Sequence, residues 1–284
     1  MANPYPTLTD TPALTPLLLR GALLSPFKRP RSDADFPRTR LVLTGVRVDL
    51  ARLAAYERVC GFATGDDALP LTYPHVLGFP LAMRLMSGRA FPLPLLGLVH
   101  TSVEITRHTA APATGEYELT VYVDELAPHR RGTEATVTTE MRAGGGGAVV
   151  WESRSTYLAR HHRADPPAPE LPEAQAPLPT VAEWRLGEDV GRRYGAASGD
   201  RNPIHLYPFT ARLFGFPRAI AHGMWTAARC LAAHGTPERT LVRVQFRAPV
   251  LLPGVVEYAA EGDRFQLRSG ERIHVDGVVR PLTP

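Results

Sequence analysis

The C-terminal part of the chain contains one apolar helical stretch followed by alternating stretches. Residues 224–233 are rich in Ala, Leu and Trp and contain no proline, which predicts a buried helix that ends near Gly235. Segments with alternating or β-branched residues then predict four strands, at 241–246, 255–260, 264–268 and 273–279. One helix followed by four antiparallel strands indicates an α+β fold.

The first half of the chain shows the same order. An apolar, helix-like run spans residues 73–86, and extended segments follow at 96–106, 117–123, 132–141 and 149–158. The repeated order predicts two halves of one architecture. We expect the first half, with a proline-rich N-terminal arm, at residues 1–163 and the second at residues 181–284. A proline-rich linker is expected at residues 164–180.

Composition and charge narrow the class of protein. The chain has 284 residues and is 44% hydrophobic, which is enough for two halves of roughly 130 residues each. No apolar run reaches the ~18 residues of a membrane span and no secretory signal is recognised, so we expect a cytoplasmic protein without a membrane span. Cys60 and Cys230 predict buried free thiols. The net charge of +4 comes with scattered arginines and no nucleic-acid-binding motif, so no nucleic-acid partner is expected.

Candidate chemistry lies between Asp200 and His205, which bracket Asn202 and Pro203. Proline suits the first position of a helix that Asn202 would cap, and the turn lets a carboxylate and an imidazole converge on one small site. Such a pair suits general acid-base catalysis. The same run is equally typical of an ordinary turn in which Asp200 binds backbone amides. Metal binding is less favoured, because no HxH or HExxH occurs and the next candidate ligand, His222, precedes a glycine.

The wider segment resembles one protein family. SGDRNPIH at residues 198–205, Ala211, and GFPRAIAHGM at residues 215–224 resemble the hydratase-2 motif of MaoC-like (R)-specific enoyl-CoA hydratases and dehydratases. The resemblance implies a hot-dog fold, in which a curved antiparallel sheet wraps a long central helix. It also implies reversible hydration of trans-2-enoyl-CoA to (R)-3-hydroxyacyl-CoA. With two halves, the chain is similar to the double hot-dog members, in which a non-catalytic half makes room for a bulky acyl chain.

The resemblance implies roles for individual residues. Asp200 and His205 would activate water, Asn202 would orient them, and the backbone N–H of Gly223 at the start of the central helix would bind the thioester carbonyl. A helix start carries partial positive charge, which stabilises an enolate-like oxygen. Further candidates for orienting the site or binding substrate are His222 and Ser198. For His222, a buried histidine that bonds the backbone is an equally good interpretation.

The expected partner is an acyl thioester of coenzyme A or of acyl carrier protein, and neither a metal nor a redox cofactor is expected. Arginine can contact phosphates through two hydrogen bonds, although an exposed arginine is more often only solvated. The candidates for such contacts are Arg243, Arg247 and Arg218. We also expect a homodimer. Two alternatives stay open: a hot-dog acyl-CoA thioesterase, which would release free thiol, and a non-catalytic subunit that binds acyl thioesters.

Overall fold

The computed structural model describes residues 5–162 and 178–283, which group into two compact units. Of these residues, the first unit takes 5–47, 77–103 and 116–162, and the second takes 48–76, 104–115 and 178–283. Two segments from the first half of the chain thus belong with the C-terminal half. Of the linker expected at residues 164–180, residues 164–177 lie outside the described residues. The boundaries that the sequence predicts for the two halves stay a prediction.

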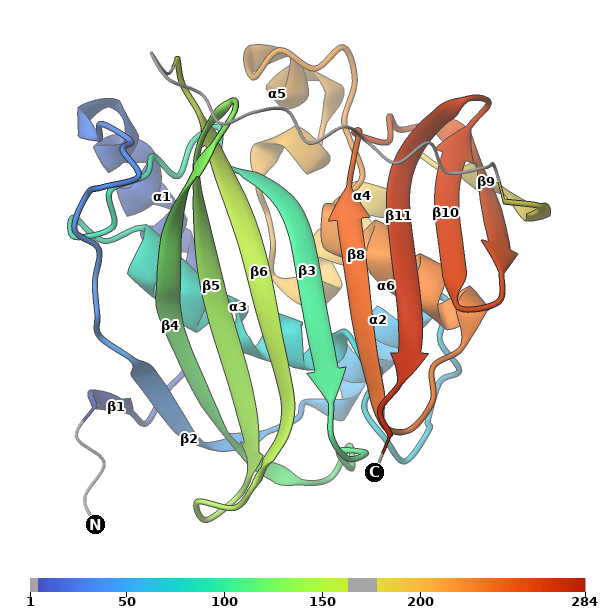
Figure 1. The fold of residues 1–284 in the computed structure, drawn as a ribbon, viewed down its shortest axis with the longest axis horizontal. Coiled ribbons are helices and arrows are strands. Elements are labelled where there is room, and N and C mark those ends of the chain that lie inside the picture. The colour runs from blue at the N-terminus through green and yellow to red at the C-terminus, as the bar shows by residue number, and fades with distance from the viewer. Residues whose placement is uncertain (1–4, 163–177, 284) are drawn as a thin grey trace. The chain divides into compact units, whose positions relative to one another are not determined.

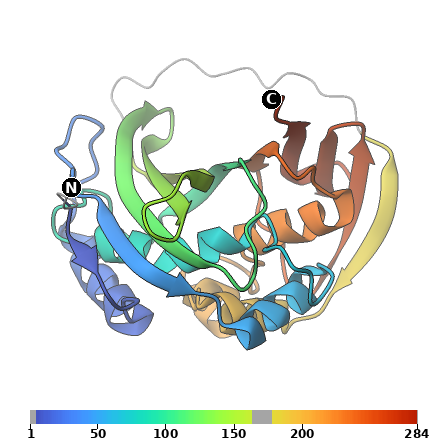
Figure 2. The same ribbon diagram turned by 90° about the horizontal axis from the view of Figure 1, so that it is seen from below.

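The first unit is a sheet with helices. Its strands lie in the order β1-β2-β4-β5-β6-β3, with β1 parallel to β2 and antiparallel pairing from β2 to β6. Figure 2 shows its longest strands curving around α3. The elements are β1 (Thr7–Leu8), α1 (Leu14–Leu24), η1 (Ser25–Phe27), β2 (Leu41–Arg47), α3 (Tyr73–Met86), β3 (Val99–Arg107), β4 (Glu116–His129), β5 (Gly132–Ala143) and β6 (Val149–Arg160). The start of α3 and the end of β3 count with the second unit.

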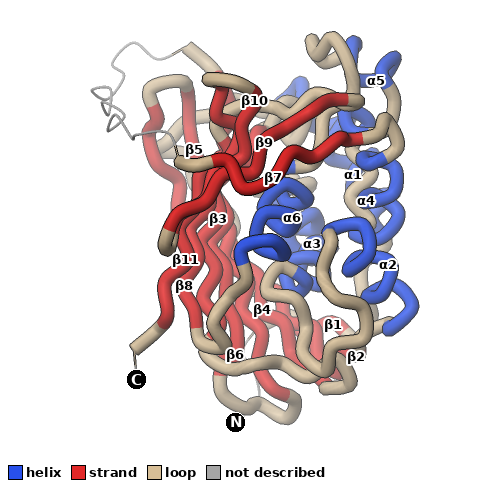
Figure 3. Tube along the Cα trace, turned by 90° about the vertical axis from the view of Figure 1, so that its right-hand side faces the viewer, coloured by secondary structure: helices blue, strands red, loops and turns tan. Residues whose placement is uncertain are grey.

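The second unit has an antiparallel sheet in the order β8-β11-β10-β9-β7. Helix α6 lies behind these strands in Figure 1. In Figure 3, α6 lies between the strands and the helices α2 and α4. The elements are α2 (Leu50–Cys60), β7 (Thr180–Leu186), α4 (Val190–Ser198), η2 (Pro203–His205), α5 (Pro208–Leu213), α6 (Gly223–His234), β8 (Thr240–Phe246), β9 (Gly254–Glu261), β10 (Arg264–Ser269) and β11 (Arg272–Pro281).

Helix α6 is the central helix of the second unit. Its buried residues lie on all sides, which is typical of a helix enclosed by its neighbours. They are Met224, Trp225, Thr226, Ala227, Ala228, Cys230 and Leu231. The indole N–H of Trp225 donates to the carbonyl of Val59 at 2.8 Å and so ties α6 to α2. The helix predicted at residues 224–233 is confirmed, with one more residue at each end.

Most predicted elements are confirmed. Strands β8 to β11 lie within two residues of their predicted bounds, and α3 has the predicted bounds. Strand β4 continues past the predicted end to His129, because a register shift between Val123 and Glu125 interrupts the alternation that marks a strand. Cys60 and Cys230 are buried free thiols, as expected. No helix among the described residues is long and apolar enough to cross a membrane.

Candidate active site

The loop that carries Asp200 and His205 begins where α4 ends. Gly199 ends α4 in the left-handed conformation, with φ 85°, and its N–H donates to the carbonyl of Gly195 at 3.0 Å. Pro203 occupies the first turn of η2, and the Asn202 side chain accepts from the Ile204 N–H at 3.4 Å. The predicted cap is therefore confirmed, and the helix that it caps is a short 3-10 turn.

Two glycines of α4 form the surface on which this loop packs. A Cβ at Gly191 would overlap with the carbonyl oxygen of His205, and a Cβ at Gly195 would lie 2.8 Å from the carbonyl oxygen of Asp200. Backbone therefore packs directly on backbone at both ends of the loop. This role was not predicted from the sequence, although two glycines four positions apart in a helix are costly unless packing requires them.

The two carboxylate oxygens of Asp200 have different surroundings. Its Oδ1 accepts from the Asn202 N–H at 3.1 Å, and its own N–H donates to the Ser198 Oγ at 3.2 Å. The ordinary-turn interpretation thus holds for one carboxylate oxygen. The other, Oδ2, lies 4.0 Å from the Nε2 of His222, and the side chain is 28% exposed. Burial raises the pKa of Asp200 above its ordinary value, while the nearby His205 lowers it by a smaller amount.

His205 and His222 form a buried pair of stacked imidazoles, with ring centroids 3.7 Å apart and planes at 27°. The Nδ1 of His205 lies 2.8 Å from the carbonyl of Ile220, so Nδ1 carries the proton and Nε2 keeps its lone pair. The Nε2 of His222 donates to the carbonyl of Asp200 at 2.9 Å. Burial lowers the pKa of both histidines, most strongly that of His222, where His205 adds to the effect. Burial therefore favours the neutral form of both rings.

Asp200, His205 and His222 converge, with one ligand-type atom from each lying within 4.8 Å of the others. A water molecule makes hydrogen bonds of about 2.8 Å, so one water can bridge two groups at that separation. A metal ion fits less well, because the Nδ1 of His205 and the Nε2 of His222 are each bonded to a backbone carbonyl. The arrangement suits proton transfer to and from a bound water.

Helix α6 begins at Gly223, as expected, and His222 precedes it with extended backbone at φ −65° and ψ 138°. The first backbone N–H groups of a helix have no acceptor within the helix and carry partial positive charge. A Cβ at Gly223 would lie 3.3 Å from the ring of Phe246, at the end of β8. Phe246, which sequence reasoning missed, therefore covers this helix start, and glycine leaves space beside its ring.

The three candidate arginines each have a partner within the protein. Arg243 donates to the carboxylate of Glu104, Arg247 pairs with Asp276 at 3.5 Å, and Arg218 donates to the carbonyl of Pro253 at 2.9 Å. In β8, Val242 and Val244 are buried whereas Arg243 between them is exposed, so Arg243 lies on the opposite face of the strand. The structure does not bring Arg243 to the Asp200 cluster. Contacts to phosphate stay a prediction.

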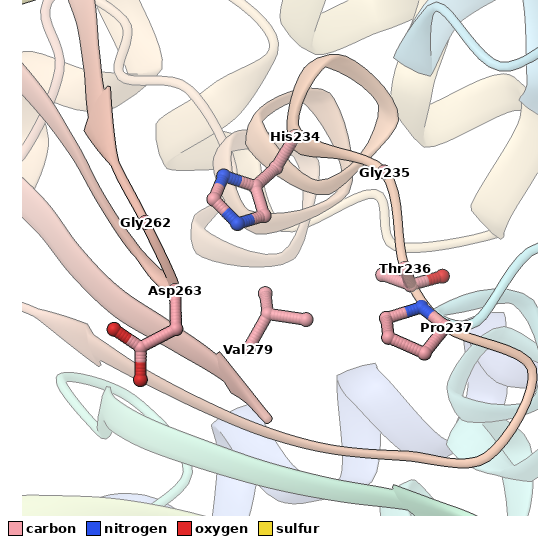
Figure 4. A pocket seen from close by; sticks show the side chains of 7 residues that line it. All are labelled: His234, Gly235, Thr236, Pro237, Gly262, Asp263 and Val279. Atoms are coloured by element: carbon pink, nitrogen blue, oxygen red, sulfur yellow. The ribbon is translucent and has the colours of Figure 1, made fainter. Parts of the chain in front are cut away.

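A pocket of about 450 Å³ lies at the other end of α6 (Figure 4). His234 and Asp263 face it, together with Gly235, Thr236, Pro237, Gly262 and Val279. His234 is the last residue of α6 and Gly223 the first, so the length of a twelve-residue helix, roughly 16 Å, separates this pocket from the cluster. The pocket is not the place where the candidate proton-transfer groups converge.

Comparison with known proteins identifies the family. A family model described as a MaoC like domain matches residues 168–279. The 3-hydroxyacyl-thioester dehydratase X of Mycobacterium tuberculosis is 37% identical over 251 residues, which are 87% of this chain and 88% of the relative. The chain belongs to the MaoC-like dehydratase family. As a MaoC-like dehydratase it is an enzyme of the hydro-lyase class.

Solved structures confirm the fold of this MaoC-like dehydratase. The crystal structure of HtdX from Mycobacterium tuberculosis matches with a TM-score of 0.75 and 35% identity, over 86% of this chain and 100% of that one. A conserved hypothetical protein of Mycobacterium tuberculosis with a double hot-dog fold matches with a TM-score of 0.51, over 87% of this chain and 95% of that one. At 11% identity the latter bears on the fold alone. The predicted α+β double hot-dog fold is confirmed.

Proposed function

We propose that this MaoC-like dehydratase catalyses the reversible hydration of trans-2-enoyl thioesters to (R)-3-hydroxyacyl thioesters, with coenzyme A or acyl carrier protein as the thiol. The observation that carries the proposal is the convergence of the Asp200 carboxylate and the His205 imidazole, whose Nδ1 is bonded to a carbonyl, beside the start of α6. A carboxylate and a neutral imidazole supply a base and, once protonated, an acid. The helix start supplies a site for negative charge on oxygen.

These groups carry out the hydration in successive steps. Asp200 and His205 hold one water, and its proton passes to the pair as its oxygen attacks Cβ of the enoyl thioester. The electron pair moves to the thioester oxygen, which the N–H of Gly223 stabilises. The proton then returns from the pair to Cα on the same side, which completes the addition of water. Dehydration is the reverse, and the proposal includes no redox or metal cofactor.

The protonation states set the pH dependence of turnover. The proposed active form has an ionised carboxylate beside a neutral imidazole. Burial raises the pKa of Asp200, which disfavours its ionised form, and lowers the pKa of His205, which favours the neutral ring. As pH falls, Asp200 takes up a proton at a higher pH than an exposed aspartate would. We therefore expect hydration in the forward direction to decline on the acidic side as the carboxylate is protonated.

The test follows the loss of enoyl-thioester absorbance with crotonyl-CoA and with a longer enoyl-CoA. Asp200→Asn and His205→Gln should each keep the fold, measured by circular dichroism, and lower kcat by at least about a hundredfold, the lower range for general acid-base groups. Matched controls are Asp263→Asn and His234→Gln, whose side chains face the pocket at the other end of α6. Near-normal turnover by either site variant would contradict the assignment.

The same assay separates the alternatives. Free thiol released without hydration would favour a thioesterase. If coenzyme A thioesters do not react, the same measurement is made with an enoyl group on acyl carrier protein. Inactivity with both carriers would favour a non-catalytic subunit. The homodimer and the cytoplasmic location stay predictions, which size-exclusion chromatography and cell fractionation would test.

A further inference from the structure

The imidazole stack continues into a series of tyrosine rings. The ring of Tyr194 on α4 lies 4.8 Å from that of His222, at 51°. The ring of Tyr56 on α2 lies 5.9 Å from Tyr194, and the ring of Tyr73 lies 5.1 Å from Tyr56 in an edge-to-face arrangement. Ring contacts therefore run without a break from His205 to α2. Tyr56, Tyr73 and Tyr194 are all at most 2% exposed.

Polar side chains follow the same path. Burial raises the pKa of Tyr194, and the neighbouring side chains of Ser198 and Tyr56 lower it by a smaller amount, so its hydroxyl lies near both. The Tyr56 hydroxyl donates to the Oγ1 of Thr72 at 2.8 Å. Ser198 in turn accepts from the N–H of Asp200. A polar network thus crosses the core of the second unit and ends at the backbone of Asp200. Buried networks whose members are satisfied hold their side chains in one arrangement.

The ring of His222 depends on such contacts. It makes one hydrogen bond, through Nε2, and its buried Nδ1 has no hydrogen-bond partner within the described part of the chain. One hydrogen bond leaves the ring free to turn about that bond, so the rings of Tyr194 and His205 are needed to fix its plane. The plane of His222 in turn sets where the stacked ring of His205 can lie.

Helix α2 holds the other end of the network in place. The Arg52 Nε donates to the carbonyl of Ala197 at 2.7 Å, near the end of α4, and the Val59 carbonyl accepts from Trp225 of α6. Figure 3 shows α2 beside α4 and α6. Asp49 caps α2 by accepting from the N–H groups of Ala51 and Arg52. A segment from the first half of the chain is thus bonded to both helices that carry the site.

We propose that Tyr194 and Tyr56 are a pair of positioning residues that fix His222, and through it His205 and Asp200, for the hydration step. The inference rests on the proposed function, because it assigns the pair to the same reaction. It gives segment 48–76, from the half without the catalytic motif, a part in holding the active site. Neither tyrosine contacts the reacting atoms; each acts through other residues.

The first test replaces only the hydroxyl group. Tyr194→Phe keeps the ring against His222 and removes the hydroxyl that lies near Ser198 and Tyr56. We expect kcat with crotonyl-CoA to fall roughly five- to tenfold and KM to stay within about twofold, because a buried polar contact behind His222 is lost and no substrate contact changes. Imidazole ¹⁵N shifts should show His205 held with its proton on Nδ1 in the wild type and exchanging between tautomers in the variant.

The matched control is Tyr258→Phe. Tyr258 is 2% exposed and its hydroxyl lies 3.1 Å from the Nδ1 of His234, so this variant removes the polar contact of another buried tyrosine hydroxyl, away from the site. We expect a similar loss of thermal stability and an unchanged kcat. Equal kcat values for Tyr194→Phe and Tyr258→Phe would overturn the inference. If Tyr194→Phe does not fold, Tyr56→Phe serves as the test variant against the same control.

The second test asks whether the two tyrosines act as a unit. Tyr56→Phe alone should lower kcat roughly threefold, although Tyr56 contacts none of the proposed catalytic residues. The double variant should lose no more than Tyr194→Phe alone, because both changes break one network. Losses in kcat that multiply would overturn the pair. An inactive wild type would instead refute the proposed function, whereas an active wild type with unaffected tyrosine variants refutes only this inference.

Discussion

The starts of helices α3 and α6 are counterparts in the two halves, and they differ in their first two backbone N–H groups. At α6, the backbone N–H groups of Gly223 and Met224 have no acceptor within the helix. At α3, the N–H of Tyr73 donates to the carbonyl of Pro70 at 2.9 Å, and Pro74 has no N–H at all. The repeated architecture alone therefore does not make a site. An oxyanion needs a helix start whose N–H groups are not already bonded.

The preceding residues differ in the same way. His222 stands before α6 and stacks on His205, whereas Thr72 stands before α3 and accepts a hydrogen bond from Tyr56. Thr72 is fully buried and has no proton to exchange near neutral pH. One helix start therefore carries proton-transfer groups, and the other contributes to the network that positions them.

The largest expected effect comes from removing a backbone N–H at the start of α6, where α3 has a proline. Gly223→Pro removes the N–H while keeping the helix, since proline is favoured at the first helical position and the backbone of His222 is extended. We expect kcat to fall by about 10² to 10³, as on loss of an oxyanion donor. Gly223→Ala is the control, because it keeps the N–H and adds a Cβ 3.3 Å from Phe246. Similar kcat values for the two variants would show that the amide does not bind the oxyanion.

The next effect tests the glycine surface of α4. Replacing glycine by alanine inside a helix ordinarily stabilises it by about 0.5–1 kcal/mol. Gly191→Ala should instead destabilise the protein by about 1–3 kcal/mol, because the Cβ would overlap with the carbonyl oxygen of His205, and it should lower kcat by displacing His205. Gly195→Ala, with 2.8 Å to the Asp200 carbonyl oxygen, should show a smaller change. Thermal unfolding and the crotonyl-CoA assay measure both, and a raised Tm for Gly191→Ala would contradict the packing argument.

The sequence predicted the parts that repeat and alternate, and it missed the contacts that assemble them. Periodicity located α3, α6 and most strands, and the spacing from Asp200 to His205 indicated the acid-base pair. Helix α2 was not predicted, and nothing local in its sequence shows that Tyr56 packs beside Tyr194, 138 positions further along the chain. The direction in which Phe246 points and the bonded N–H of Tyr73 also depend on tertiary packing. Such contacts join segments distant in sequence, so no local pattern records them.

A moderate effect is expected on the way the free energy of unfolding depends on pH. Burial lowers the pKa of His205 and His222 in the folded protein below the ordinary 6.5, so the unfolded chain binds protons more readily. The folded state should therefore lose stability as pH falls below about 6.5, by at most about 1.4 kcal/mol per pH unit for each histidine. His222→Asn replaces one titrating group and should make the decline between pH 7 and 5 shallower in urea unfolding. The decline should not vanish, because burial also lowers the pKa of His75, to about 4. An unchanged slope would show that His222 titrates as an exposed histidine does.

The smallest expected effect is at the other helix start. Pro74→Ala gives α3 an N–H that it lacks, but the N–H of Tyr73 remains bonded to Pro70, and Thr72 supplies no proton. We expect kcat of Pro74→Ala to stay within about twofold of the wild type, since no catalytic contact changes. The double variant Gly223→Pro with Pro74→Ala should be as slow as Gly223→Pro alone. Recovery of activity in the double variant would mean that α3 can bind the oxyanion, and the difference between the two helix starts would then lie in the side chains around them rather than in the backbone.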